Sequence, residues 1–199
     1  MAKKLESNFK NIFLVLLVTT IVAALALNIT YYATKDAIAK AKEAKLEAAI
    51  KDVIPDFDEL IEQVVIDASG NEIKIFDCLK DGEKIGVAIE SYTMKGFSGK
   101  IEVMVGFRLD GTITKTVVLG HSETPGLGDK IDASKDDFPR QFWNKNIADL
   151  QTNNKVRVKK DGGKIIDAIT AATISSRAFC DAIDHAWETY QYHNKEGGK

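Results

Sequence analysis

The stretch that decides the fold is KIEVMVGFRL-DG-TITKTVVL, residues 100–119. From Ile101 to Leu109 every second residue is apolar, and a second strand-like run follows at Thr112–Leu119. Alternation with a period of two predicts β-strands with one buried face. Asp110-Gly111 separates the two runs, and this dipeptide favours a hairpin because both residues tolerate positive φ. The sequence therefore predicts an antiparallel β-hairpin.

Further strands and helices are predicted on both sides of this hairpin. Shorter strand-like runs lie at Gln63–Ile66, Glu72–Asp77, Lys84–Tyr92, Lys155–Lys160 and Lys164–Ala168. Helices are expected around Asp136–Asn144 and over Ile174–Tyr192, where apolar residues recur every third or fourth position. The predicted class is α+β, an antiparallel sheet with flanking helices.

The N-terminal region contains a long apolar run. Ile12 to Leu27 carries no charge, and the uncharged run continues to Ala33. About 20 apolar residues are enough to cross a bilayer as a helix. Ala24-Leu25-Ala26 resembles a signal-peptide cleavage site, so a cleaved leader is the alternative. The length of the run and the aromatic pair Tyr31-Tyr32 favour an uncleaved, single transmembrane helix.

Charge suggests an orientation for this anchor. Lys3, Lys4 and Lys10 precede the run and favour a cytoplasmic N-terminus, with the following domain outside the cytoplasm. Residues 34–55 are rich in Ala, Lys and Glu and predict a helix. It can be a stalk, the first helix of the domain, or both. We therefore expect a tail and anchor at 1–33, a helical stalk at 34–55 and a folded domain at 56–199.

Several functions find no support in composition and spacing. With 27 basic and 29 acidic residues the chain has no nucleic-acid-binding signature. Cys78 and Cys180 are far apart and lack zinc-site spacing, and we expect no disulfide between them. Gly96-Phe97-Ser98-Gly99 is one residue short of a G-x-S-x-G nucleophile motif. We expect no catalytic residue and no metal ligand.

The segment before the last predicted helix is a candidate binding site. It reads Asp167-Ala168-Ile169-Thr170-Ala171-Ala172-Thr173, and the pattern predicts Thr173 as the N-cap. The N–H groups of Ile174 to Ser176 would be free at such a helix start, where the helix dipole also favours a phosphate. From the residues alone, a plain cap and a cofactor anchor both remain open.

Two glycine-containing loops interrupt the predicted sheet. They are Gly96–Gly99 and Gly120–Gly128, and small residues there let the backbone approach a flat ligand closely. Pro125-Gly126 alone is typical of a type II turn.

Together these segments resemble the FMN-binding domains of the RnfG and NqrC branch. Asp167–Thr173 resembles the flavinylation motif D-x-x-[ST]-G-A-T, Glu123–Gly128 resembles an E-T-P-G-L-G segment, and Gly96–Gly99 is similar to a G-[FY]-x-G loop. The resemblance spans residues 12–192 and fits RnfG better than the longer NqrC proteins. Ala171 stands where glycine is usual; because alanine adds only a methyl group, we expect the modification to survive.

The resemblance implies an FMN joined through its phosphate to Thr173 by a separate flavin transferase that uses FAD. It implies that Asp167 serves transferase recognition or metal-assisted attachment, and that Thr170 hydrogen-bonds the phosphate. Ala171 and Ala172 would leave space for that group.

The resemblance also implies which residues line the isoalloxazine. These are Glu123, Thr124, Gly126, Leu127 and Gly128 from one loop, and Gly96 and Phe97 from the other. Phe97 could equally be a core aromatic residue. Lys130 or Arg177 could stabilise a reduced flavin, and a solvated surface role is equally compatible with each.

The implied function is that of an electron-carrying component of a Rnf complex in a bacterial or archaeal cell membrane. Such complexes couple electron flow between ferredoxin and NAD to Na⁺ or H⁺ translocation, and the implied partners are the other membrane subunits. Two alternatives stay open. One is an FMN subunit of another membrane redox complex of the NqrC kind; the other is a flavin-free anchored sensor or assembly module.

Overall fold

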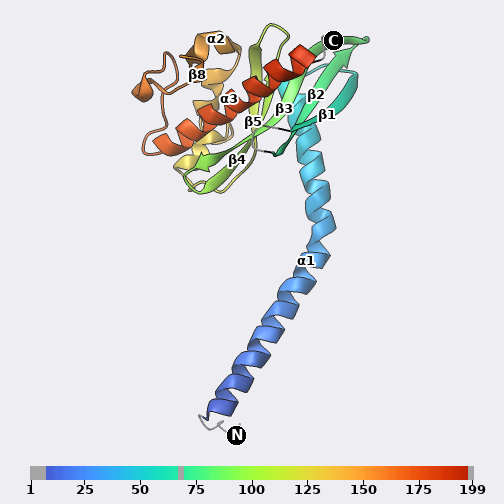
Figure 1. Ribbon diagram of the computed structural model, residues 1–199, viewed down its shortest axis with the longest axis vertical. Coiled ribbons are helices and arrows are strands. Elements are labelled where there is room, and N and C mark those ends of the chain that lie inside the picture. The colour runs from blue at the N-terminus through green and yellow to red at the C-terminus, as the bar shows by residue number, and fades with distance from the viewer. Residues whose placement is uncertain (1–7, 67–69, 197–199) are drawn as a thin grey trace. The chain divides into compact units, whose positions relative to one another are not determined.

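The computed structural model describes residues 8–66 and 70–196 and divides into two compact units, residues 1–44 and 45–199 (Figure 1). Helix α1 (Phe9–Val53) contributes to both units, because its last turns from Lys45 onward belong to the second.

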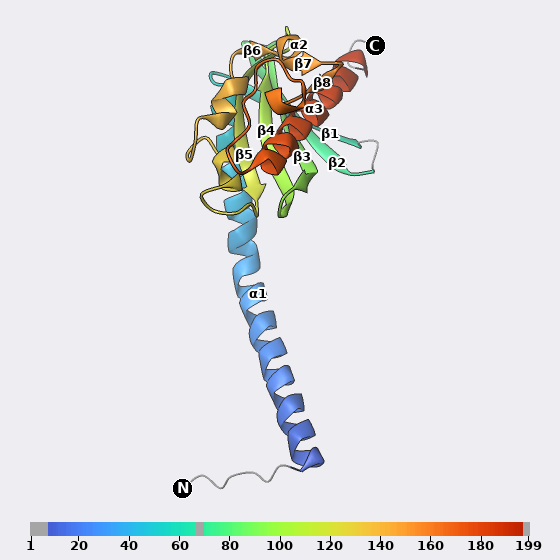
Figure 2. The same ribbon diagram turned by 90° about the vertical axis from the view of Figure 1, so that its left-hand side faces the viewer.

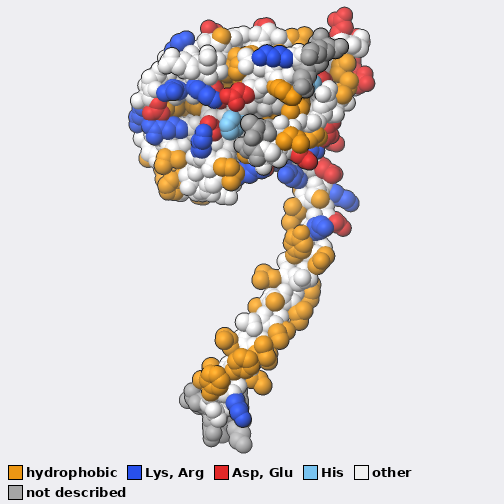
Figure 3. Space-filling model, in the orientation of Figure 1, with side chains coloured by type: hydrophobic (Ala, Val, Ile, Leu, Met, Phe, Trp, Pro, Cys, Tyr) orange, Lys and Arg blue, Asp and Glu red, His pale blue; other side chains and the backbone are white. Residues whose placement is uncertain are grey.

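The first unit is an apolar helix. An 18-residue window of α1 has a mean hydropathy of 2.7, and none of it is buried. Hydrophobic side chains cover the visible surface of this helix (Figure 3). By length and composition it can cross a membrane. Lys3 and Lys4, on which the predicted orientation partly rests, lie outside the described residues.

The second unit is built on a six-stranded antiparallel sheet in the order β1-β2-β3-β4-β5-β6. Its strands are β1 (Glu59–Ile66), β2 (Glu72–Lys80), β3 (Glu83–Gly96), β4 (Gly99–Phe107), β5 (Thr112–His121) and β6 (Lys145–Asn146). A separate pair is formed by β7 (Gln151–Thr152) and β8 (Lys155–Val156). The helical segments of this unit, apart from the end of α1, are η1 (Gly128–Ile131), η2 (Phe138–Phe142), α2 (Ile147–Leu150), η3 (Lys159–Asp161) and α3 (Thr173–Glu196). The predicted α+β arrangement, an apolar helix followed by an antiparallel sheet, is confirmed.

The hairpin predicted at residues 100–119 is formed by β4 and β5. Its turn differs from the expectation, because only Gly111 has a positive φ, of 81°. The Asp110 side chain instead accepts the Thr112 N–H at 2.8 Å, and Arg108 N–H donates to the Thr112 carbonyl at 2.8 Å. The connection is thus a four-residue loop rather than a tight two-residue turn.

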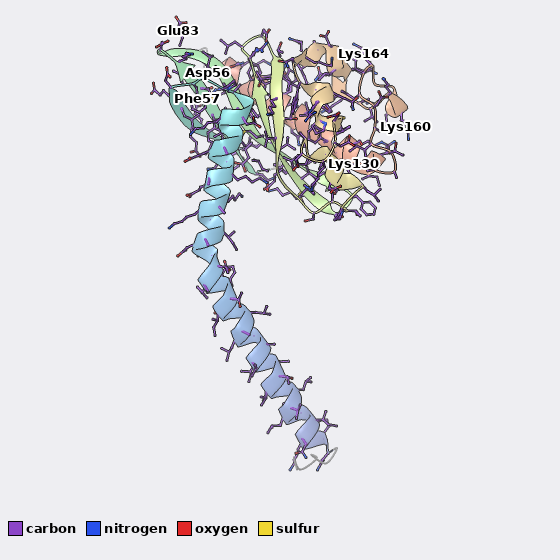
Figure 4. All side chains as sticks on the ribbon, turned by 180° about the vertical axis from the view of Figure 1, so that it is seen from behind. Asp56, Phe57, Glu83, Lys130, Lys160 and Lys164 are labelled. Carbon is purple, nitrogen blue, oxygen red and sulfur yellow. The ribbon has the colours of Figure 1, made fainter. Side chains whose placement is uncertain are left out.

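The two faces of the sheet are covered by different helices. Helix α3 lies across one face (Figure 1), and Figure 2 shows the same helix in front of β3 and β4. On the other face, Ala49, Ile50 and Val53 of α1 pack against Phe76 in β2. Beyond α1 the chain passes through Asp56 and Phe57, labelled in Figure 4, into β1.

This layering separates the two cysteines. Cys78 belongs to the cluster on the α1 side of the sheet, and Cys180 belongs to the cluster under α3. Both thiols are free and buried, and burial raises the pKa of Cys78 to about 11. The sheet therefore stands between the two thiols, in agreement with the expectation of no bridge.

The predicted strands at Lys155–Lys160 and Lys164–Ala168 are mostly wrong. The region forms the short β8, the 3-10 turn η3 and an isolated parallel bridge between Val158 and Ile166. The chain folds back so tightly that Gly163 N–H donates to the Val158 carbonyl at 3.1 Å. This turn replaces the expected hairpin.

The helix predicted at Asp136–Asn144 is also wrong in type. The residues form the 3-10 segment η2, which ends before Asn144. Asn144 has φ 54°, and its N–H donates to the Ile113 carbonyl of β5 at 2.7 Å. That bond to the sheet pulls the chain out of helical geometry.

Candidate functional site

A pocket of about 320 Å³ lies beside the start of α3. It is formed by the β3–β4 turn, the loop after β5 and the beginning of α3. Its walls are Phe97, Glu123, Thr124, Leu127, Gly128, Ala171, Ala172, Thr173, Ile174 and Ser175. All but Ile174 and Ser175 are residues that the sequence predicts for the cofactor site, so three separate segments meet in one cavity.

Helix α3 begins one residue earlier than the expected cap implies. Its first helical hydrogen bond runs from Ser176 N–H to the Ala172 carbonyl at 3.0 Å, so Ala172 is the cap residue and Thr173 the first residue inside the helix. Ser176 explains the shift: its hydroxyl accepts the Ile169 N–H at 2.9 Å and donates to the Ala172 carbonyl at 3.0 Å. The prediction of Thr173 as N-cap is therefore wrong by one position.

The first turn of α3 presents backbone donors. Within the described residues, the N–H groups of Thr173, Ile174 and Ser175 have no protein acceptor. The expected set was Ile174 to Ser176, and the shift follows from the earlier helix start. Free N–H groups and the positive end of the helix dipole together suit a phosphate or another anion.

Ala171 has a backbone conformation that favours glycine. Its φ is 62°, in the left-handed region, just before the Ala172 cap. An L-residue there costs about 1–2 kcal/mol because its Cβ approaches the following carbonyl oxygen. The difference from glycine is thus a backbone effect as well as the added methyl group that the sequence suggests.

The loop after β5 contains the predicted type II turn. Gly126 has φ 77°, and Leu127 N–H donates to the Thr124 carbonyl at 3.2 Å, which closes the four residues 124–127. Gly126 is exposed and does not line the pocket. Its part is to shape the loop that presents its neighbours Leu127 and Gly128.

Three other predicted residues also lie outside the pocket wall. Gly96 ends β3, and Thr170 is exposed. Asp167 is exposed and forms an ion pair with Lys159 at 2.8 Å.

Gln141 is a neighbour of the motif that the sequence did not reveal. Its side-chain amide accepts the Asp167 N–H at 2.8 Å and donates to the Asp167 carbonyl at 3.1 Å. A polar side chain in a 3-10 turn carries no periodic signal, so only the folded structure shows that it fixes this backbone.

The two candidate cations have different surroundings. Arg177 forms a two-pronged ion pair with Asp161, both contacts at 2.6 Å, which raises the pKa of Arg177 and lowers that of Asp161. Lys130, labelled in Figure 4, lies on η1 next to Gly128 and is 4.0 Å from Asp136. Neither side chain lines the pocket.

Comparison with known proteins identifies the family. A family model described as an FMN-binding domain matches residues 96–188. A protein of Vibrio atlanticus is 35% identical over 175 residues, which cover 84% of this chain and 83% of that protein. Relatives in Aliivibrio fischeri (35% identity; 96% and 94% covered) and Pseudoalteromonas atlantica (33%; 92% and 88%) are similarly close. All three are named as the RnfG component of an ion-translocating oxidoreductase complex.

The chain belongs to the RnfG family. The region matched by the FMN-binding model contains every residue that lines the pocket. It also contains Asp167, Thr170, Gly96 and Gly126, the predicted residues outside the pocket wall.

The pocket has the features that an FMN needs. Free N–H groups lie at one end, at the start of α3, where a phosphate can bind. Phe97, Leu127 and Ile174 supply exposed apolar surface for a flat ring. Glycine and alanine at Gly128, Ala171 and Ala172 keep the space between these groups open.

Proposed function

We propose that this chain carries FMN as a phosphoester on the Thr173 hydroxyl and serves as a membrane-anchored electron carrier. One observation carries the proposal. A half-buried threonine stands in the pocket wall at the first residue of α3, within the turn whose N–H groups are free.

The phosphate end of the cofactor follows from this placement. A flavin transferase using FAD would join the FMN phosphorus to Thr173 Oγ, with loss of the hydroxyl proton and release of AMP. The phosphodiester so formed keeps one negative charge. The N–H groups of Ile174 and Ser175 and the helix dipole would stabilise that charge.

The ring end follows from the apolar wall of the pocket. Phe97, Leu127 and Ile174 are 66%, 43% and 47% exposed, respectively. Contact with an isoalloxazine would remove part of this apolar surface from water, which is favourable. When bound, the flavin supplies reversible uptake and release of electrons, and the protein contributes its position and surroundings.

The exposed motif residues suit recognition by the transferase. Asp167 and Thr170 lie at the surface, just before the pocket, where a second protein can reach them. The bonds from Gln141 hold the Asp167 backbone in place. We propose that the transferase reads Asp167, and that Thr170 reaches the phosphate once it is attached.

The cellular role follows from the family and the apolar helix. The relatives are named as subunits of an ion-translocating oxidoreductase complex, and the first unit is a helix able to span a membrane. We propose that the N-terminus is cytoplasmic, that the second unit is extracytoplasmic, and that the other membrane subunits are its redox partners. Its electron transfer, between ferredoxin and NAD, would be coupled to Na⁺ or H⁺ translocation.

The test is to express the full chain with and without a flavin transferase of this family. The proposal predicts yellow protein whose flavin fluorescence survives a denaturing gel only when the transferase is present. A colourless protein under both conditions would instead support the flavin-free sensor or assembly module. Neighbouring genes for the other subunits would separate a Rnf-type complex from an NqrC-like one.

A further inference from the structure

Glu123 is a buried carboxylate that joins two other segments of the site. Only 4% of this residue is exposed. Its Oε1 accepts the backbone N–H of Ser98 at 2.9 Å, and its Oε2 accepts the hydroxyl of Ser175. Ser98 belongs to the β3–β4 turn and Ser175 to the first turn of α3. One side chain thus bonds to both neighbouring walls of the pocket.

The backbone around this carboxylate leaves room for it. A Cβ added at Gly96 would lie 2.8 Å from Glu123 Oε1, and one added at Gly128 would lie 2.6 Å from Oε2. Side chains at these two positions would therefore displace the carboxylate. This gives both glycines a role that does not require contact with a flavin.

Glu123 is held by hydrogen bonds and has no ion-pair partner. Within the described residues, no lysine, arginine or histidine nitrogen lies within 4.0 Å of its carboxylate. Its own backbone is fixed, because its N–H donates to His121 Nδ1 at 3.1 Å. A buried carboxylate needs such donors, and losing one costs more than an exposed hydrogen bond would.

Both ends of this connection are next to groups that the proposed cofactor would contact. Phe97, the residue before Ser98, lies in the pocket wall, and Thr173 is two residues before Ser175. The Gly96–Gly99 turn is otherwise at the exposed end of a hairpin, where Phe97 is 66% exposed. The bond to Glu123 therefore restrains the turn that carries the aromatic ring.

We infer that Glu123 is a positioning residue: its two oxygens latch the β3–β4 turn to the first turn of α3 and hold Phe97 and Thr173 on opposite sides of one pocket. The part of this inference that concerns flavin rests on the proposed function. The latch itself is a property of the protein without flavin and can be measured there.

The experiment uses the full chain in detergent, made without transferase, with four variants. Glu123→Gln keeps the bridge, because its carbonyl can accept from Ser98 and its amide can donate to the Ser175 hydroxyl. Glu123→Ala removes the bridge, and Ser175→Ala removes only one arm. Glu102→Gln is the control, a carboxylate on β4 that pairs with Lys100 at 2.7 Å and lies outside the pocket.

Hydrogen exchange of the peptide that contains Ser98 is the first measurement. Loss of the bridge should speed exchange of this amide by roughly tenfold in Glu123→Ala. The increase should be smaller in Ser175→Ala, and exchange should be unchanged in Glu123→Gln and Glu102→Gln. Unchanged exchange in Glu123→Ala, or equal acceleration in Glu123→Gln, would overturn the latch.

Flavin uptake is the second measurement, made after co-expression with the transferase. Covalent loading, or the visible absorption band of the loaded flavin, should change in Glu123→Ala and return to normal in Glu123→Gln. Faster exchange together with unaltered loading and spectrum would contradict the positioning role. If the unsubstituted chain takes up no flavin at all, the proposed function fails, and the exchange data still decide the latch.

Discussion

Ala171 is the residue at which this chain departs from the motif, and the structure gives the departure a physical meaning. The residue adopts φ 62°, which alanine tolerates poorly and glycine tolerates well. The position lies between the exposed Thr170 and the helix cap at Ala172, so the strained conformation is what turns the chain into α3.

Replacing this alanine by glycine should stabilise the protein. We expect Ala171→Gly to raise the free energy of unfolding by about 1 kcal/mol, because the relief of the left-handed conformation outweighs the greater freedom of glycine in the unfolded chain. Denaturant unfolding of the two proteins measures this difference. Ala178→Gly, in the interior of α3, should destabilise instead. A loss of stability in Ala171→Gly would show that φ at this position is not strained.

Single residues also mark how far the sequence could predict the site. The three segments that form the pocket could be predicted through their resemblance to a family, and the structure brings them together. Ser175 and Gln141 could not be predicted, because their contacts join residues 52 and 26 positions away in the chain. Neither residue type nor spacing records a bond of that kind.

Among the secondary-structure elements, α3 organises the domain through a buried acid. Asp184 is 4% exposed, and both of its oxygens accept the Val156 N–H of β8, at 2.9 and 3.1 Å. Burial raises the pKa of Asp184 to about 6, although the bond from Val156 opposes the rise. Helix α3 thereby holds the short β7–β8 pair at the cost of keeping a carboxylate away from water.

This contact gives stability a pH dependence. The folded-state pKa of Asp184 lies above its usual value of 3.8, so the folded chain binds more protons than the unfolded chain between about pH 4 and pH 6. Its contribution should therefore lower the free energy of unfolding as pH rises through that window, by up to about 1.4 kcal/mol per pH unit. Below pH 4 the penalty should be absent, and above pH 6 complete.

Asp184→Asn should remove this slope, because the asparagine oxygen still accepts from Val156 but does not titrate. Urea unfolding of both proteins between pH 4 and pH 7 gives the difference between their curves. Asp149→Asn, a change at an exposed position of α2, serves as the control. Parallel curves for the parent and Asp184→Asn would mean that Asp184 does not titrate in this range.

The elements also differ in how well periodicity could predict them. Strands β2 to β5 and helix α3 have long amphipathic patterns, since each buries one face against the same sheet core. The region from β8 to η3 has no such pattern, because its shape depends on a few specific bonds. Val156 N–H to Asp184 and Gly163 N–H to the Val158 carbonyl are two of them. Long-range contacts of this sort override local strand propensity.

For the whole molecule, the central expectation is retention in a membrane by the first unit. The full chain should stay in the membrane fraction after an alkaline wash and should keep residues 12–33, as peptide mass spectrometry can show. Val22→Arg, within the uncharged run, should weaken insertion by about 3 kcal/mol. Ile38→Arg, on α1 beyond that run, should have little effect. A mature chain that lacks residues before Asn28 would show a cleaved leader instead of an anchor.

The attachment of flavin to Thr173 is the claim on which the electron-carrier role depends. Trypsin should release residues 165–177 as one peptide, which contains Thr170, Thr173, Ser175 and Ser176 as possible attachment points. After co-expression with the transferase, fragment ions of this peptide identify the modified hydroxyl. Thr173→Ala removes the proposed acceptor and leaves the helix start intact, while Thr170→Ala is the matched control.

The most direct test is therefore fragment-ion mass spectrometry of peptide 165–177 from the parent chain and these two variants. We predict an added mass of FMN less one water on Thr173 in the parent, the same mass in Thr170→Ala, and an unmodified peptide in Thr173→Ala. A flavin mass on any other residue, or one that persists in Thr173→Ala, would contradict the account.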